Sequence, residues 1–268
     1  MIIDFHTHNF PDRIAERTIS LLESHGTKAN TNGTLQGLKD SMKDADIDIS
    51  VVLPVMTAVK QFETVNKYAA ETNGKDGIIS FGGIHPECDS PEEKLEYIKS
   101  LGLKGVKIHP DYQGSFINDE RYIRIIKHCV KTGLFVVTHA GLDPAFPEVV
   151  RATPERILDM YDKVYCGKEP ERASIILAHL GSLDETDKVM EMIAGKMFYL
   201  DTAVMLDRIS GDKTVRLIKA HGSDKILFAT DSPWAPQKKF VELLKDLPLT
   251  DDEKDNILWK NAKNMLNI

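Results

Sequence analysis

The sequence predicts an α/β protein with the (β/α)₈ TIM-barrel fold, built as a single domain over residues 1–268. Eight short apolar runs rich in β-branched residues recur along the chain, helical patterns separate them, and no run is followed by a nucleotide-binding glycine-rich motif. Apolar runs that do not alternate with polar residues are typical of parallel strands buried on both faces. Eight βα units in a chain of this length favour a closed barrel over the alternative, an open doubly wound sheet.

The predicted strands start at intervals of mostly one βα unit. They are residues 2–5, 49–55, 77–84, 105–108, 134–138, 173–178, 197–200 and 225–230. A helix is predicted after the fourth strand, because apolar residues from Tyr122 to Val130 recur at i, i+3, i+4, i+7 and i+8 before Gly133.

Capping signals predict where four further helices begin. Serine or threonine precedes proline at residues 90 and 153, and precedes glutamate by three residues at residues 90, 182 and 250. Such side chains accept hydrogen bonds from the free backbone N–H groups of a helix. The long connection at residues 26–33 is either a lid over an active site or a plain surface loop.

The composition is that of a globular protein, with 42% hydrophobic and 28% charged residues. The net charge of −7 disfavours nucleic-acid binding, because an acidic surface repels phosphate groups. The chain has no apolar run long enough for a membrane span, no signal-peptide pattern at its start, and only three, widely spaced cysteines (Cys88, Cys129 and Cys166). We therefore expect a cytoplasmic protein that binds a small molecule, with no nucleic-acid or membrane partner.

Histidines gather at the ends of the predicted strands. Six of the nine lie there: His6, His8, His85, His109, His139 and His179. In a TIM barrel all C-terminal strand ends meet at one rim, and that rim carries the chemistry. The sequence therefore predicts that these distant residues share one functional site.

The strongest local motif is His6–Thr7–His8, at the end of the first strand. Residues i and i+2 of a strand point to the same side, so the two imidazoles are spaced to bind one cation. The alternative is that both histidines are solvent-exposed and bind nothing, but the apolar strand before them favours a role as metal ligands.

His139, His179 and Asp231 end the fifth, sixth and eighth predicted strands. Either histidine alone is commonly a packed rim residue, and the aspartate could cap the next turn. An aspartate after a fully apolar strand is nevertheless costly to bury unless it is paired or bound to metal. With His6 and His8 these residues form a set that suits Zn²⁺ best, with Mn²⁺, Fe²⁺ and Co²⁺ as alternatives.

Lys107 and His109 lie at i and i+2 of the fourth strand. A lysine inside a barrel needs an anion beside it, and three roles fit: binding a substrate carboxylate, carbamylation to bridge a second metal, or pairing with a buried acid. His85 is a candidate for substrate contact or a structural hydrogen bond, and Trp234 for a pocket wall or packing. Asp201 is predicted to support the site rather than to react.

Five stretches of the chain match a known family pattern. They are residues 4–8 (DFHTH), 105–110 (GVKIHP), 137–141 (VTHAG), 177–181 (LAHLG) and 227–234 (LFATDSPW). In this order they resemble the amidohydrolase superfamily, and more narrowly the amidohydrolase-related family that includes aminocarboxymuconate-semialdehyde decarboxylase. The motifs run from the first strand to the last, so the resemblance covers nearly the whole chain.

This resemblance implies a distorted TIM barrel of the metal-dependent hydrolase type with one divalent metal ion at its rim. His6, His8, His139 and Asp231 fall on the ligand positions of the family, and His179 on the position that holds or polarises the metal-bound water. A homodimer is a further expectation at the level of the family.

The predicted activity is hydrolysis of an amide, lactone or ester bond in a small anionic molecule by a metal-activated water. Asp231 and His179 are the predicted catalytic residues, with Asp231 carrying the proton. The predicted substrate-binding residues are Lys107, His109, His85 and Trp234.

Three other functions remain open on the sequence. A non-oxidative decarboxylase would use the same metal. A two-metal phosphoesterase would need a carbamylated Lys107, because related barrel deoxyribonucleases carry a glutamate on this strand. A non-catalytic barrel stapled by its metal is disfavoured, because structural zinc sites are usually closed and rich in cysteine.

Overall fold

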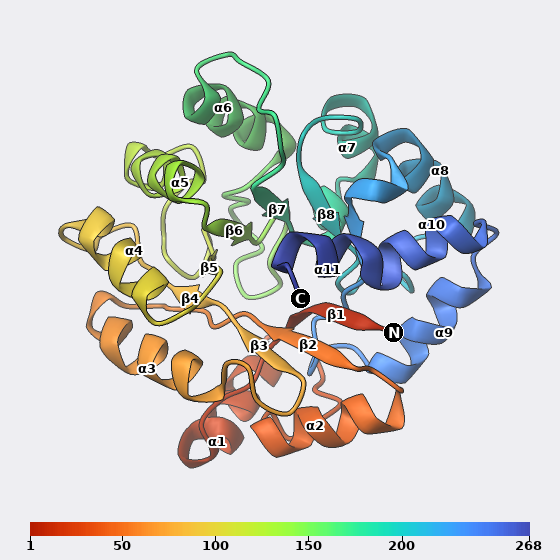
Figure 1. The fold of residues 1–268 in the computed structure, drawn as a ribbon, viewed down its shortest axis with the longest axis horizontal. Coiled ribbons are helices and arrows are strands. Elements are labelled where there is room, and N and C mark those ends of the chain that lie inside the picture. Colours follow the sequence, from red (N-terminus) through yellow and green to blue (C-terminus); the bar gives the residue numbers. More distant parts are fainter. The chain divides into compact units, whose positions relative to one another are not determined.

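The computed structural model describes all 268 residues, in which strands alternate with helices along the chain (Figure 1). The residues pack into two compact units. The first unit comprises Met1–Val52, Gly74–Ile79 and Asp201–Ile268, and the second comprises Leu53–Asn73 and Ser80–Leu200. None of the helices combines the length and the apolar character that crossing a membrane requires.

In the first unit, β1 (Ile3–Thr7) lies between two neighbours. On one side it runs parallel to β2 (Ile49–Val52), which is followed by β3 (Ile78–Ser80). On the other side it meets β9 (Ile226–Leu227), since Phe5 N donates to Phe228 O at 2.8 Å. The residues that follow β1 and β9 are thereby brought close together.

The helices of the first unit surround these strands. They are α1 (Asp12–Glu23), α2 (Leu35–Asp44), α8 (Gly211–His221), α9 (Gln237–Asp246), α10 (Asp251–Asp255) and α11 (Asn261–Leu266), with the short turns η3 (Ser223–Lys225) and η4 (Asn256–Lys260). Helix α2 packs against α9, and α11 against β1 and β9.

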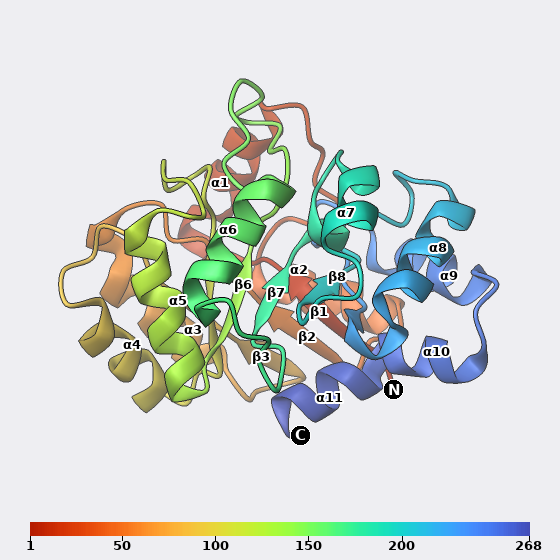
Figure 2. The ribbon, with the colours of Figure 1, turned by 90° about the horizontal axis from the view of Figure 1, so that it is seen from above.

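In the second unit, five parallel strands lie side by side in chain order: β4 (Gly82–Gly83), β5 (Gly105–Ile108), β6 (Phe135–Thr138), β7 (Ile175–Leu177) and β8 (Tyr199–Asp201), the last residue of which, Asp201, belongs to the first unit. Helices α3 (Phe62–Thr72), α4 (Pro91–Ser100), α5 (Glu120–Thr132), α6 (Pro154–Tyr165) and α7 (Thr186–Met192) connect them, with turns η1 (Val59–Gln61) and η2 (His179–Gly181). Helices α4, α5 and α6 lie along one side of these strands (Figures 1 and 2). Every residue of β5, β6 and β7 is buried, as their apolar runs predict.

All eight predicted strands are confirmed, but the third is divided into β3 and β4 at Phe81. The two glycines of β4 explain the close packing there. A Cβ on Gly82 would lie 2.8 Å from the side chain of Ile98 and 2.7 Å from Asn66 Oδ1. Only glycine at this position lets α3 and α4 approach the strand so closely.

The helix predictions are mostly confirmed. Helix α5 buries Tyr122, Ile125, Ile126 and Cys129 and ends at Gly133 with a φ of 81°, a left-handed conformation that favours glycine. Thr153 and Thr250 cap α6 and α10 by accepting backbone N–H groups.

Two capping predictions are wrong. Helix α4 begins at Pro91 as expected, but Ser90 has a φ of 41° and its side chain caps nothing. Helix α7 begins only at Thr186, so Ser182 does not cap it. Ser182 follows η2 instead and donates its hydroxyl to the Glu185 carboxylate at 3.2 Å. The capping-box spacing therefore marked a side-chain pair outside the helix.

Candidate active site

The ends of β1 and β9 bring together three of the predicted metal ligands in the first unit. His6 and His8 present their Nε2 atoms to each other at 3.2 Å. Asp231 Oδ1 lies 2.9 Å from His8 Nε2 and 3.4 Å from His6 Nε2. The backbone explains this convergence, because Asp231 N donates to His6 O at 2.8 Å and His8 N donates to Ser232 O at 2.6 Å.

This cluster fits a divalent metal ion. One ligand atom of each of His6, His8 and Asp231 lies within 4.8 Å of the others. Two imidazole nitrogens and one carboxylate oxygen form a donor set that Zn²⁺, Mn²⁺ and Fe²⁺ all accept. A cation would also stabilise the Asp231 carboxylate, which is nine-tenths buried.

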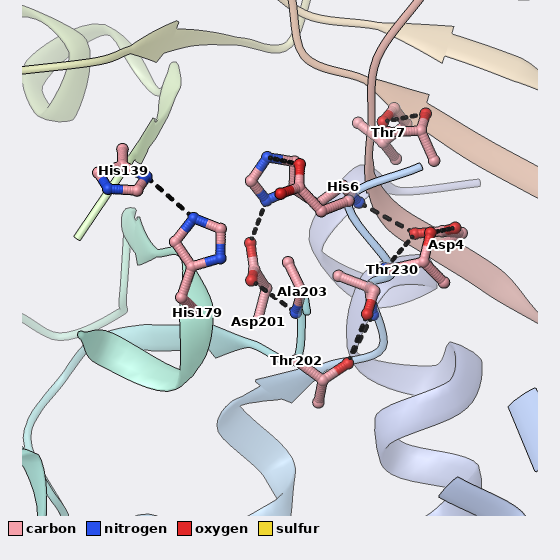
Figure 3. Close-up of polar contacts among 12 residues, drawn as sticks. Asp4, His6, Thr7, His139, His179, Asp201, Thr202, Ala203 and Thr230 are labelled. Atoms are coloured by element: carbon pink, nitrogen blue, oxygen red, sulfur yellow. Dashed lines mark hydrogen bonds and ion pairs between the residues drawn. The ribbon is translucent and has the colours of Figure 1, made fainter. Parts of the chain in front are cut away.

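Asp201 orients His6, as the sequence analysis expected of a supporting residue. Its Oδ2 lies 2.8 Å from His6 Nδ1, and its Oδ1 accepts from Ala203 N at 3.1 Å (Figure 3). An ionised Asp201 that accepts the Nδ1–H group leaves the lone pair of His6 Nε2 directed into the cluster.

Asp4 is a central residue of this unit that sequence reasoning missed. Its carboxylate is fully buried and accepts from Thr230 N at 3.0 Å and Thr230 Oγ1 at 2.6 Å (Figure 3). It also accepts from Gln237 Nε2 at 2.8 Å. His6 N also donates to it at 3.3 Å. Burial raises the pKa of Asp4 to about 7. The residue fixes the segment before Asp231 against β1, and its signal in the sequence is an aspartate inside an apolar strand.

The second unit gathers other predicted site residues at the ends of β5, β6 and β7. His179 Nε2 lies 2.9 Å from His139 Nδ1 (Figure 3), and the His139 ring stacks on His109 with centroids 4.3 Å apart. His109 Nε2 lies 3.4 Å from Asp143 Oδ2. His109, His139 and Asp143 form a second buried group whose ligand atoms lie within 4.8 Å of one another.

Asp111 lies beneath this group. It is fully buried, and its Oδ2 is 3.9 Å from His139 Nε2. Burial, together with the nearby Asp143, raises the pKa of Asp111 to about 6. Arg151 approaches it with its backbone N at 3.3 Å and its Nη1 at 3.5 Å from Oδ1. The sequence analysis singled out none of these three residues.

Gln113 is the organising residue of the second unit and was also missed. Its buried side chain donates from Nε2 to Met56 O at 2.8 Å and Ile84 O at 2.7 Å. Its Oε1 accepts from His109 N at 3.0 Å and from Tyr122 Oη at 2.7 Å. All four hydrogen-bonding positions of the amide are therefore used, and the residue ties together the segments that precede or carry His85 and His109.

We expect Gln113→Glu to destabilise the protein by about 2 to 3 kcal/mol, because a carboxylate oxygen would replace the amide donor that faces two buried carbonyl groups. Denaturant unfolding monitored by circular dichroism measures this loss. Tyr122→Phe removes only one of the four bonds and should cost about 1 kcal/mol. An equal effect of the two variants would contradict the role assigned to the amide.

The remaining predicted residues are placed as follows. Lys107 is buried on β5. His85 is also buried, its burial lowers its pKa, and its Nδ1 accepts a hydrogen bond from Glu87 N at 3.2 Å. Trp234 is half-buried, and its backbone N donates to Asp231 O at 2.8 Å. The substrate contacts of these residues and of His109, and the carbamylation of Lys107, stay predictions.

The loop at residues 26–33 is attached beside Asp231. Asn30 donates to Pro233 O from its backbone N at 2.7 Å and from its side chain at 3.3 Å. Gly33 O accepts from Phe10 N at 2.8 Å. These bonds place the loop next to the segment that carries Asp231, one of the predicted metal ligands, while its role as a lid stays a prediction.

Comparison with solved structures identifies the fold. A 2,6-dihydroxybenzoate decarboxylase from Rhizobium aligns with a TM-score of 0.76 and 15% identity over 99% of this chain and 98% of its own. The 5-carboxyvanillate decarboxylase from Sphingomonas paucimobilis aligns with a TM-score of 0.71 and 14% identity over 100% and 99% of the two chains. The chain thus has the TIM-barrel fold that the sequence predicts.

A third relative carries a metal. The dihydroxybenzoic acid decarboxylase from a Polaromonas species, solved with bound manganese and an inhibitor, aligns with a TM-score of 0.71 and 15% identity over 99% of this chain and 96% of its own. A search of curated proteins gives no significant match. The family model described as amidohydrolase matches residues 3–268, and the chain therefore belongs to the amidohydrolase family.

Proposed function

We propose that this protein is a metal-dependent decarboxylase that releases CO₂ from a small carboxylate. The convergence of His6, His8 and Asp231, with Asp201 behind His6, is the observation that carries the proposal. Membership of the amidohydrolase family supports metal-dependent chemistry, and three structural neighbours named as decarboxylases favour this reaction over hydrolysis.

His6, His8 and Asp231 would hold the metal ion, and we propose His139 as the fourth ligand on the strength of the family motif. The bound ion would supply Lewis acidity that stabilises negative charge developing on the substrate. The donor set accepts both Zn²⁺, the first choice from the sequence, and Mn²⁺, which the Polaromonas enzyme contains.

Decarboxylation also needs a proton, because the carbon that loses CO₂ keeps the electron pair of the broken bond. We propose Asp231 and His179 as the groups that carry this proton. If His139 binds the metal through Nε2, its proton lies on Nδ1 and is donated to His179 Nε2. That bond fixes the ring of His179 and leaves its own proton on Nδ1.

Hydrolysis of an amide, lactone or ester remains a second candidate, because the matching family model is described as amidohydrolase. A single-turnover assay with carboxyl-labelled 2,6-dihydroxybenzoate and 5-carboxyvanillate, followed by a wider set of small carboxylates and lactones, separates the two. We expect labelled CO₂ from at least one carboxylate. Turnover of lactones or amides without any CO₂ would contradict the proposal and favour the hydrolase.

We expect His139→Ala to lower the metal content of protein purified without chelator from about one ion per chain to well below one half, because removal of a ligand costs affinity directly. Elemental analysis measures the content. His128→Ala is the matched control in the same unit, since His128 only pairs with Glu96 at 2.8 Å on the outer helices. An unchanged metal content of the His139 variant would remove this residue from the ligand set.

A further inference from the structure

The loops after β5 and β6 carry an aromatic and basic surface that no sequence motif predicted. It consists of Tyr112, Phe146 and Arg151, called here the recognition surface. Phe146 meets Tyr112 edge to face with ring centroids 5.1 Å apart, and the Arg151 guanidinium lies 5.8 Å from the centre of the Phe146 ring. Each of the three side chains is partly exposed and therefore accessible to a ligand.

This surface continues into the buried histidines of the second unit. Tyr112 contacts His109 edge to face with centroids 4.7 Å apart, and His109 stacks on His139. A ligand on the recognition surface would thus lie against residues that the family motif assigns to the reaction. The surface and these histidines both follow the ends of the neighbouring strands β5 and β6, so they belong to the same functional region.

Two buried polar atoms at this place form no hydrogen bond. Arg151 Nη1 makes an ion pair with Asp111 Oδ1 at 3.5 Å but donates no hydrogen bond. Asp111 is 2% exposed, and its Oδ2 also has no hydrogen-bond partner. Buried donors and acceptors are almost always satisfied, because each unsatisfied one costs free energy. The Arg151 guanidinium therefore keeps an N–H donor that an anionic ligand can use, beside the ion pair with Asp111.

We infer that Arg151 binds the carboxylate of a planar ligand whose ring lies on Phe146 and Tyr112. A guanidinium offers paired N–H donors that match a carboxylate, and aromatic side chains favour a flat partner. Asp111 Oδ1 accepts a hydrogen bond from Arg151 N at 3.3 Å and lies 3.5 Å from Nη1, which holds the guanidinium in place beside Phe146. The inference rests on the proposed function in that the ligand is the acid that the enzyme decarboxylates.

Binding to the holoenzyme, measured by calorimetry, tests the inference with three probes: benzoate, its neutral analogue benzamide, and the non-planar anion cyclohexanecarboxylate. We expect wild-type protein to bind benzoate more tightly than the other two. Arg151→Gln should lower the affinity for benzoate by about tenfold or more, because a charged hydrogen bond is removed. The affinity for benzamide should stay the same. Phe146→Leu should reduce the ratio of the affinity for benzoate to the affinity for cyclohexanecarboxylate.

Arg156→Gln is the matched control, because Arg156 stacks on the exposed Phe116 at 4.4 Å and has no place on the recognition surface. It should bind all three probes as the wild type does. Equal benzoate affinity of wild type and Arg151→Gln, or no benzoate binding at millimolar concentration, would overturn the inference. Since binding is measured without turnover, this outcome is distinct from a failure to release CO₂.

Discussion

Asp231→Asn should lower the rate of CO₂ release by about a thousandfold or more, because the residue is proposed both to bind the metal and to carry a proton. General acid–base catalysis alone contributes about 10² to 10⁴ in rate. The amide also loses the negative charge that lies 2.9 Å from His8 Nε2 and 3.4 Å from His6 Nε2, which weakens the hold on a cation. Single-turnover kinetics and elemental analysis on the same sample measure both losses.

Asp207→Asn supplies the control for this experiment. Asp207 is an exposed aspartate of the same unit, paired with Lys239 at 2.7 Å, so its loss removes a surface ion pair only. It should keep the rate and the metal content of the wild type. An Asp231→Asn variant that retains its metal and turns over at the wild-type rate would contradict both roles proposed for Asp231, metal binding and proton transfer.

The sequence predicted the parts of the site that depend on local spacing. His6 and His8 follow from the two-residue period of a strand, and Asp231 from the cost of ending an apolar strand with an acid. Their convergence was predicted from the parallel order of the strands. The structure confirms it through the backbone bonds between the residues after β1 and β9.

Residues that act across elements could not be found in this way. Asp4 and Gln113 make contacts with residues as far as 233 and 57 positions away in the chain, and no local pattern reports such partners. Arg151 lies in an irregular loop, where neither periodicity nor a motif applies. Ser182 shows the opposite error. The three-residue spacing from Ser182 to Glu185 predicted a helix start, but the two side chains pair with each other before the helix begins.

The strongest effect on stability is expected from Asp4→Ala. The substitution leaves the Thr230 backbone N–H, the Thr230 hydroxyl and the Gln237 amide group without their buried acceptor. Each unsatisfied buried donor costs about 1 to 3 kcal/mol, and partial relaxation lets the three share the penalty. We therefore expect a loss of about 3 to 5 kcal/mol, which for a chain of this size lowers the Tm by roughly 10 °C.

Calorimetry on metal-free protein measures this loss without a contribution from ion binding. Asp48→Ala is the control, because Asp48 also accepts a backbone bond beside β1, from Ile2 N at 2.7 Å, but is half-exposed and can be replaced by water. Thr230→Val removes the hydroxyl that donates to Asp4 and accepts from Ser232 N, and should cost about 2 kcal/mol, less than Asp4→Ala. If Asp4→Ala unfolds at the same temperature as Asp48→Ala, Asp4 does not hold β1 and β9 together, and the alignment of His6 with Asp231 must have another source.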